Sequence, residues 1–231
     1  MIDRCGRNID YLRISVTDRC NLRCIYCMPE EGIRLTEREK ILQEPEIIRV
    51  CKVMAELGIT KIKLTGGEPL VRPRIPGLIR QIKEISGIEK VTLTTNGILL
   101  KDQMQDLADA GLDSLNISLD TLDEECFCKI TRRNLLEETL EGIREAMKYP
   151  EVQLKINCVP LGMEEQDLCG IAEFAHKNPV HVRFIEMMPI GYGSSFAGMP
   201  QEKIMNLVEQ KFGKMIPYNG KPLGNGPCTY Y

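Results

Sequence analysis

The chain has 231 residues, of which 43% are hydrophobic, and a formal net charge of −3. This composition supports a folded core and excludes a disordered polymer. The slightly negative charge gives no basic field for nucleic acid, and no apolar run is long enough to cross a bilayer. The N-terminus has no apolar signal segment, and ten cysteines without a pairing pattern fit a reducing compartment. We therefore expect a cytoplasmic protein that binds neither nucleic acid nor membranes.

Strand-like segments alternate with amphipathic helical segments along most of the chain. Pro45 suits the first turn of a helix, and Gly58 suits its end. Such alternation implies parallel strands joined by right-handed crossovers. The predicted strands are residues 12–16, 61–64, 91–94, 115–119, 152–159 and 180–185, and the helices begin at 45 or cover about 78–85, 102–110, 135–147, 168–175 and 201–212.

Six such units predict an α/β fold, a partial (β/α)6 barrel of the TIM type rather than the full eight units. A doubly wound open sheet is the competing architecture, because hydrophobic period alone cannot decide closure. Polar groups such as Thr65-Gly66-Gly67, Thr94-Thr95-Asn96 and Glu186 follow strand ends, where barrel enzymes place their sites, and this favours the barrel. We expect one core domain over residues 1–231, with 187–231 the loop-rich start of a C-terminal region.

One short loop carries three cysteines, Cys20, Cys24 and Cys27, at C-x3-C-x2-C spacing. Three thiolates on a compact loop can hold an iron–sulfur cubane and leave its fourth iron open for a small molecule. A structural zinc site would need a fourth Cys or His nearby, and both histidines lie far downstream. A disulfide pairing leaves one cysteine over, and incidental thiols are the remaining alternative.

The cysteine spacing, with an aromatic residue before the last cysteine, resembles the signature of the radical S-adenosylmethionine (SAM) enzymes. The longer string around it resembles one family in particular, the GTP 3′,8-cyclases of molybdenum cofactor biosynthesis (the molybdenum cofactor biosynthesis protein A family). The matching strings are residues 12–29 (LRISVTDRCNLRCIYCMP), 65–70 (TGGEPL), 94–97 (TTNG), 116–120 (NISLD) and 183–186 (RFIE). They span nearly the whole chain in order.

The resemblance implies the radical SAM fold and two cofactors, a 4Fe–4S cluster and SAM. Cys20, Cys24 and Cys27 would hold the cluster through three of its irons, and the open iron would chelate SAM. In the family, the turn that matches Thr65–Pro69 contacts the amino group of SAM through its backbone. The SAM contacts implied for this chain are Tyr26, Gly67, Ser118 and Met188. From the residues alone, Met188 could equally be a core methionine and Ser118 a strand-end cap.

The resemblance also implies four GTP contacts: Arg13, Lys63, Thr94 and Lys155. Cations that point into a barrel are costly unless an anion meets them, and a triphosphate would. Surface exposure is the alternative for a single lysine. The family usually has Arg at the position of Lys63, so the planar two-pronged contact of Arg is absent there.

The implied activity is that of a lyase. SAM is cleaved reductively to a 5′-deoxyadenosyl radical, and GTP is rearranged to 3′,8-cyclo-7,8-dihydro-GTP. A reductant such as flavodoxin or ferredoxin and a homodimer are implied partners. We expect the chain to be C-terminally truncated, because the family's second three-cysteine cluster has no counterpart before Tyr231. The alternatives are another substrate, or a non-catalytic SAM- or nucleotide-binding domain. Five cysteines have no assigned role: Cys5, Cys126, Cys128, Cys158 and Cys228.

Overall fold

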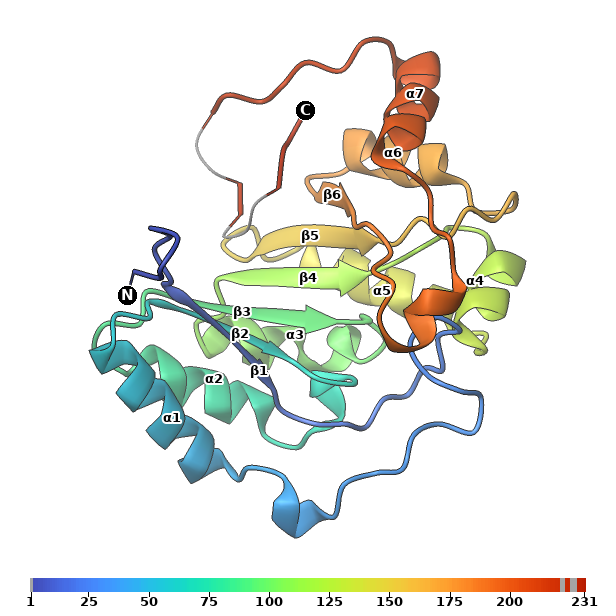
Figure 1. Cartoon of the computed structure of the whole chain (residues 1–231). Coiled ribbons are helices and arrows are strands. Elements are labelled where there is room, and N and C mark those ends of the chain that lie inside the picture. The colour runs from blue at the N-terminus through green and yellow to red at the C-terminus, as the bar shows by residue number, and fades with distance from the viewer. Residues whose placement is uncertain (1, 221–222, 225–227) are drawn as a thin grey trace. The chain divides into compact units, whose positions relative to one another are not determined.

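The computed structural model describes residues 2–220, 223–224 and 228–231, so part of the expected loop-rich stretch lies outside the described residues (Figure 1). The chain divides into two compact units. Unit 1 comprises Met1–Leu22, Glu31–Ser118 and Leu135–Lys155, and unit 2 comprises Arg23–Glu30, Leu119–Asn134 and Ile156–Tyr231. Within the described part, no helix is both long and apolar enough to cross a membrane. The expectation of one domain stays a prediction.

Unit 1 is a parallel sheet whose strands alternate with helices. The register pairs Arg13 with Lys63, Lys63 with Thr92, and Thr92 with Ser114. Helices α1 and α2, α2 and α3, and α3 and α5 pack against one another. The elements are β1 (Tyr11–Ser15), η1 (Arg38–Lys40), α1 (Glu44–Glu56), β2 (Lys61–Thr65), η2 (Pro69–Val71), α2 (Ile75–Lys83), β3 (Lys90–Thr95), α3 (Leu100–Asp109), β4 (Ser114–Ser118) and α5 (Leu136–Ala146).

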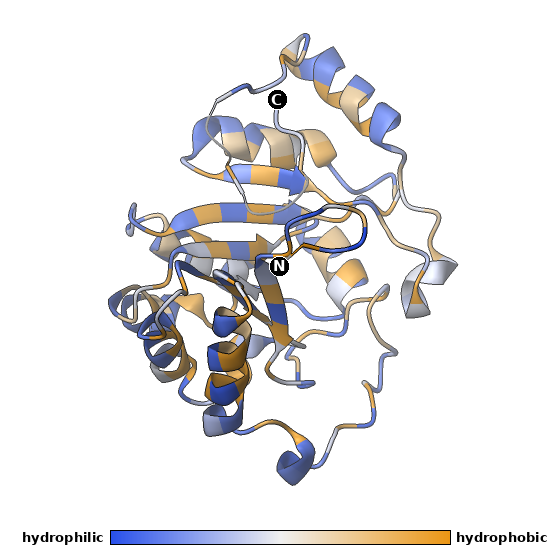
Figure 2. Cartoon of the chain, turned by 60° about the vertical axis from the view of Figure 1, so that its left-hand side comes forward, coloured by the Kyte–Doolittle hydropathy of each residue, from blue (hydrophilic) through white to orange (hydrophobic). Residues whose placement is uncertain are grey.

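The two faces of this sheet differ sharply in chemistry. One face is apolar, and on β2, β3 and β4 it is fully buried, with Ile62 and Leu64 of β2 beside equally buried residues of β3 and β4. The neighbouring helices contribute buried Ile79, Ile82 and Leu107 to the same core. Successive side chains of a strand point to opposite faces, so the polar residues of each strand share the other face. Figure 2 shows hydrophobic and hydrophilic residues alternating along the strands.

The strand order of the sheet follows the chain, from β1 to β6. A doubly wound sheet would reverse its order at a switch point, and this order does not reverse. The partial (β/α)6 fold class is therefore confirmed and the competing architecture is wrong. The predicted strands and helices all form, with ends that differ by one to three residues. The last helix, α7 (Gln201–Phe212), has the predicted bounds.

Unit 2 contains one helix that the sequence did not predict, α4 (Glu124–Thr131). Its first turn is capped by Asp123, whose side chain accepts a hydrogen bond from the Cys126 N–H at 2.7 Å. Helix α6 packs on both α7 and β6. The other elements are α6 (Leu168–Lys177), β6 (His181–Phe184) and η3 (Gly191–Ser195), while β5 (Gln153–Cys158) contributes its first half to unit 1 and its second half to unit 2.

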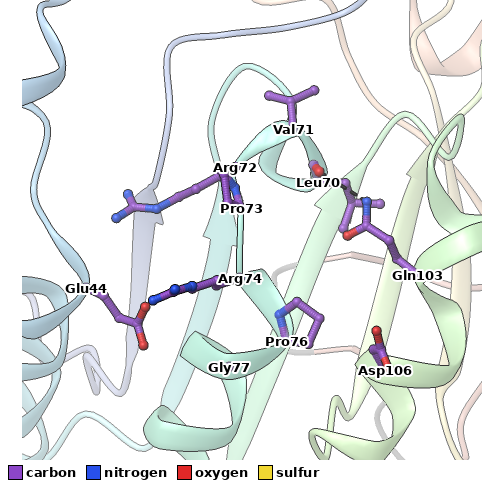
Figure 3. A pocket seen from close by; sticks show the side chains of 10 residues that line it. All are labelled: Glu44, Leu70, Val71, Arg72, Pro73, Arg74, Pro76, Gly77, Gln103 and Asp106. Atoms are coloured by element: carbon purple, nitrogen blue, oxygen red, sulfur yellow. Dashed lines mark hydrogen bonds between the residues drawn. The ribbon is translucent and has the colours of Figure 1, made fainter.

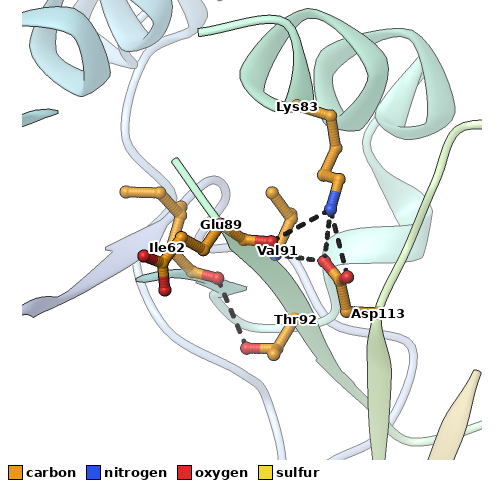
Figure 4. A network of polar contacts seen from close by, with 6 residues as sticks. All are labelled: Ile62, Lys83, Glu89, Val91, Thr92 and Asp113. Carbon is orange, nitrogen blue, oxygen red and sulfur yellow. Dashed lines mark hydrogen bonds and ion pairs between the residues drawn. The ribbon is translucent and has the colours of Figure 1, made fainter. Parts of the chain in front are cut away.

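A polar network ties the amino ends of β3 and β4 to the end of α2 (Figure 4). The Lys83 ammonium donates to both carboxylate oxygens of Asp113 at 2.9 and 3.0 Å, and to the Glu89 carbonyl at 3.2 Å. The Val91 N–H also donates to the Asp113 carboxylate, at 2.6 Å. This carboxylate therefore fixes the start of β3, at the edge of the sheet opposite to the predicted site.

We expect Asp113→Ala to lower the free energy of unfolding by about 1–3 kcal/mol, because the N–H of the buried Val91 loses a charged acceptor. Urea denaturation of the variant and the parent measures this difference. The matched control is Lys148→Ala, which removes an exposed ion pair with Glu145 and should change the same free energy by less than about 0.5 kcal/mol. Equal effects of the two substitutions would contradict the role assigned to Asp113.

Candidate active site

The turn after β2 lies directly on the backbone that leads into the cysteine loop. A Cβ atom at Gly66 would clash with the Thr17 carbonyl oxygen, and one at Gly67 would clash with that of Arg19. The Gly67 N–H donates to the Thr17 carbonyl and the Glu68 N–H to the Arg19 carbonyl, both at 2.7 Å. Only glycine allows two backbones to approach this closely. The carboxyl ends of β1 and β2 are therefore joined immediately before Cys20.

Glu68, which follows the two glycines, joins this turn to the end of β3. Its side chain is 1% exposed. The carboxylate accepts hydrogen bonds from the Leu70 N–H (2.9 Å), the Thr95 hydroxyl (2.7 Å) and the Asn96 N–H (2.7 Å). Burial raises the pKa of Glu68, and these three donors oppose that shift. The sequence analysis assigned Glu68 no role, although a carboxylate after a glycine pair, with a Thr-Asn turn at the end of the next predicted strand, was a usable signal.

The first part of the cysteine loop is anchored to the same turns within unit 1. The side-chain amide of Asn96 donates to the Asn21 side-chain oxygen at 2.7 Å. The Leu22 N–H points at the Cys20 sulfur at 3.4 Å. An amide that points at a cysteine sulfur suits a thiolate ligand, because such hydrogen bonds stabilise the negative sulfur of iron–sulfur sites. The surroundings of Cys20 therefore fit a cluster ligand.

The second part of the loop belongs to unit 2, where Cys24 and Cys27 lie on one tight turn. The N–H groups of Cys27 and Met28 both donate to the Cys24 carbonyl, at 2.9 and 3.1 Å. All three motif cysteines are free thiols, and none is buried. The described residues contain no group of three or more His, Cys, Asp or Glu side chains arranged around a metal position. The three thiols are nevertheless the donor set that an iron–sulfur cubane takes.

Tyr26, between the last two cysteines, is tied to a buried carboxylate of unit 2. Its hydroxyl donates to Asp120 Oδ2 at 2.7 Å, and the Val159 N–H donates to Oδ1 at 2.8 Å. Asp120 is 6% exposed, and burial raises its pKa to about 6 against the opposing effect of these two donors. The Gln166 amide donates to the carbonyls of Asp120 and Val159. Asp120 therefore holds Tyr26, a predicted SAM contact, and was missed as a supporting residue.

The predicted GTP contacts lie on the polar face of the unit 1 sheet. Arg13 and Lys63 are register partners on β1 and β2, so two cationic side chains stand side by side. Thr94 is on the same face of β3, next to Asn116 of β4. Lys155 of β5 is 4% exposed, and its ammonium donates to the Gln153 side chain at 2.7 Å. The register thus makes Arg13 and Lys63 neighbours, and their role as GTP contacts stays a prediction.

The two remaining predicted SAM contacts lie in different units. Ser118 is the last residue of β4 and is half-buried. Met188 follows β6 and is 62% exposed, so it is not a core methionine in unit 2. Its neighbour Met187 packs instead against the buried cluster of Cys126, Ile130 and Leu161.

A pocket of about 560 Å³ lies away from these residues, beside the start of α2 (Figure 3). Its polar lining consists of Glu44, Arg72, Arg74, Gln103 and Asp106. None of the predicted cluster, SAM or GTP contacts lines it. The Arg72 guanidinium beside it is already used, donating to the carbonyls of Val16 and Leu42. The chemistry of the chain therefore points to the strand ends and not to this pocket.

Substitution of Gly67 tests the close approach of the two backbones. We expect Gly67→Ala to lower the free energy of unfolding by about 1–3 kcal/mol, because the added methyl group must displace the Arg19 carbonyl. Gly77→Ala is the matched control: nothing lies within 4 Å of its added carbon, and alanine should stabilise helix α2 by about 0.5–1 kcal/mol. Urea denaturation of the two variants checks both signs, and a neutral Gly67→Ala would contradict the steric argument.

Removal of the Tyr26 hydroxyl should destabilise the protein in a pH-dependent way. In the folded protein Asp120 keeps its proton up to about pH 6, whereas in the unfolded chain it loses the proton at about pH 4. The folded state therefore binds one more proton than the unfolded state between these pH values. The free energy of unfolding falls as the pH rises through this window. Above about pH 6 the Asp120 carboxylate is charged, and Tyr26→Phe removes one of its hydrogen-bond donors. This loss should lower the free energy of unfolding by about 1–3 kcal/mol. We expect a smaller cost at pH 5 than at pH 8 in urea unfolding.

The control for this prediction is Tyr149→Phe, which removes an exposed hydroxyl that donates to Gln105 at 3.0 Å. Its effect on unfolding should stay below about 0.5 kcal/mol at both pH values. A Tyr26→Phe effect that is independent of pH would show that the Asp120 carboxylate does not depend on the tyrosine hydroxyl.

Comparisons with known proteins agree on one family. The profile of the Radical SAM superfamily matches residues 14–175. A GTP 3′,8-cyclase from Pelotomaculum thermopropionicum is 44% identical over 235 residues, covering 100% of this chain and 72% of that protein. A GTP 3′,8-cyclase from Clostridium perfringens is 45% identical over 232 residues, covering 100% of this chain and 71% of that protein. Molybdenum cofactor biosynthesis protein 1 of Dictyostelium discoideum is 46% identical over 190 residues, 82% of this chain and 30% of that one.

Solved structures with the same fold have much lower sequence identity. Streptococcus suis SuiB bound to its precursor peptide SuiA superposes with a TM-score of 0.72 at 18% identity, covering 87% of this chain and 44% of that one. Native anSMEcpe with bound AdoMet superposes with a TM-score of 0.62 at 18% identity, covering 77% of this chain and 51% of that one. These two structures support the fold alone, whereas the relatives with 44–45% sequence identity also identify the family. The chain belongs to the radical SAM superfamily and, within it, to the GTP 3′,8-cyclase family.

Proposed function

We propose that this chain is the radical SAM domain of a GTP 3′,8-cyclase, a lyase that rearranges GTP to 3′,8-cyclo-7,8-dihydro-GTP in molybdenum cofactor biosynthesis. The observation that carries the proposal is the joining of the cysteine loop to the Gly66–Gly67 turn, beside a sheet face with paired cations. The first feature suits a cluster with SAM next to it, and the second suits a triphosphate.

In this proposal Cys20, Cys24 and Cys27 hold a 4Fe–4S cluster. When bound, the cluster supplies the electron for cleavage of SAM to methionine and a 5′-deoxyadenosyl radical. The protein contributes the position of the three thiols. The Leu22 N–H stabilises the sulfur of Cys20, and the turn over residues 24–28 presents the other two.

The proposed SAM contacts divide by chemistry. The Gly67 N–H donates to the Thr17 carbonyl, so in this proposal the carbonyl oxygen of the exposed Gly67 would accept a hydrogen bond from the ammonium of SAM. Ser118 would contact the ribose. Met188 would border the adenine, which its exposed position permits. Tyr26, fixed by Asp120, would complete the site beside the cluster.

The proposed GTP contacts are Arg13, Lys63, Thr94 and Lys155. Two neighbouring cations on one sheet face suit a ligand that carries several negative charges. A triphosphate supplies several negative charges and many acceptor oxygens. Binding there would hold the GTP ribose in a fixed orientation, and exclusion of water would protect the radical from other hydrogen donors.

The proposal also includes a cellular compartment, an electron donor and an oligomeric state. The ten free cysteines support work in the reducing cytoplasm. The electron would come from a flavodoxin or a ferredoxin, and the protein would act as a homodimer.

The test uses protein expressed from its complete reading frame, loaded with iron and sulfide under anaerobic conditions. GTP deuterated at C3′ is supplied with SAM and a reductant. We expect 5′-deoxyadenosine to carry deuterium, because the radical takes the C3′ hydrogen. Unlabelled 5′-deoxyadenosine would indicate another substrate. Absence of any 5′-deoxyadenosine from iron-loaded protein would favour a non-catalytic binding domain.

Substitution of Lys63 tests the assignment of the triphosphate. We expect Lys63→Ala to weaken GTP binding by about 1.5–3 kcal/mol, the range for a hydrogen bond to a charged group. Lys63→Arg should preserve or improve binding, and SAM affinity should hardly change. Isothermal titration calorimetry measures both affinities. Lys52→Ala, on the exposed surface of α1, is the control. Parent-like GTP affinity in Lys63→Ala would show that Lys63 is not a phosphate ligand.

A further inference from the structure

Arg132 ends helix α4 in a backbone conformation that arginine rarely adopts. Its φ angle is 57°, in the left-handed region, and its N–H donates to the Cys128 carbonyl at 2.8 Å. Glycine takes this conformation without a steric penalty, whereas in other residues the Cβ atom strains the backbone. The backbone alone therefore does not explain an arginine at this helix end.

The Arg132 side chain connects the two ends of the segment that carries Cys24 and Cys27. Its Nη1 donates to the Arg23 carbonyl at 3.0 Å and to the Met28 carbonyl at 2.9 Å. These carbonyls directly precede Cys24 and directly follow Cys27. One guanidinium nitrogen thus closes the cysteine segment into a loop through two charge-assisted hydrogen bonds.

The last turn of α4 holds the same segment through its backbone. The Arg23 N–H donates to the Thr131 carbonyl and the Ile25 N–H to the Ile130 carbonyl, both at 2.9 Å. Carbonyls at a helix end have no partner inside the helix, so these bonds satisfy them. The left-handed residue that stops α4 also turns its own side chain back onto the bound segment. Helix end, segment and side chain therefore form one unit.

We propose that Arg132 is a positioning residue that holds Cys24 and Cys27 in the conformation needed for metal binding. A free loop must lose backbone entropy when its thiols take up metal. The clamp formed by the two hydrogen bonds of Arg132 Nη1 restricts the segment already during folding, so less entropy is lost on metal binding. The strain at Arg132 is kept because a long, charged side chain is needed to reach both carbonyls. Arg132 itself does not touch the reacting atoms. The proposal rests on the proposed function only in taking Cys24 and Cys27 as ligands.

The first test uses the metal-free protein, so it does not depend on activity. Arg132→Gly removes the clamp and fits the left-handed backbone, so the helix end should still form. We expect amide hydrogen exchange in peptides covering residues 23–28 to become at least tenfold faster, while the melting temperature is unchanged or higher. Arg133→Ala is the matched control, because the neighbouring arginine is exposed and its guanidinium donates to the Arg132 carbonyl, not to the cysteine segment. It should leave this exchange within twofold of the parent.

The second test measures the loss of iron to a chelator after anaerobic reconstitution. We expect release at least tenfold faster in Arg132→Gly, partial recovery in Arg132→Lys, and parent-like release in Arg133→Ala. Parent-like rates of both exchange and release in Arg132→Gly would overturn the proposal. So would global unfolding of both the Gly and Lys variants, since this would make Arg132 a general fold residue. A parent that binds no iron would instead refute the proposed function, while the exchange result would still decide the clamp.

Discussion

The contact between the Gly66–Gly67 turn and the backbone of residues 17–19 is the constraint on which the candidate site of unit 1 depends. No side chain fits between these two stretches, and backbone hydrogen bonds cross the gap in both directions, since the Val16 N–H also donates to the Thr65 carbonyl at 2.8 Å. The segment that reaches Cys20 therefore leaves β1 along one fixed path. A ligand bound to the turn and a metal bound to the loop would share a single rigid base.

Each unit uses one buried carboxylate to organise its loops. Glu68 accepts three hydrogen bonds in unit 1, and Asp120 accepts two in unit 2. A buried carboxylate is costly unless donors surround it, so each one fixes the backbone N–H groups that it needs. Backbone donors from different loops then have to stay in place together. This explains why segments with many glycine and asparagine residues can form a defined site. Arg132 also fixes a loop, but with a positive charge: its guanidinium donates to two backbone carbonyls, where the carboxylates accept from N–H groups.

Much of this organisation could be predicted from the sequence, and the exceptions have physical causes. The strands and most helices follow from hydrophobic period, because a half-buried element must repeat its apolar residues at its own period. Helix α4 was missed because its eight residues are too short to show such a period. It forms because Asp123 caps its start and the cysteine segment satisfies its last carbonyls. The second of these partners is about 100 residues away in the chain, beyond any local pattern.

The sequence by itself determined the family, the alternation of strands and helices and the identity of the thiols, because motif spacing and hydrophobic period are local properties. The strand order, which decided between the partial barrel and the doubly wound sheet, came from the structure. The resemblance also implied Arg13 and Lys63 as GTP contacts, but their placement side by side depends on the register of β1 and β2. Only the tertiary structure decided which groups support them. The burial of Glu68 and Asp120, the use of the Gly67 N–H by Thr17, and the left-handed conformation of Arg132 all depend on contacts between distant segments. Such contacts depend on how helices, strands and loops pack against one another. The conformational preferences of single residues carry almost no information about this packing.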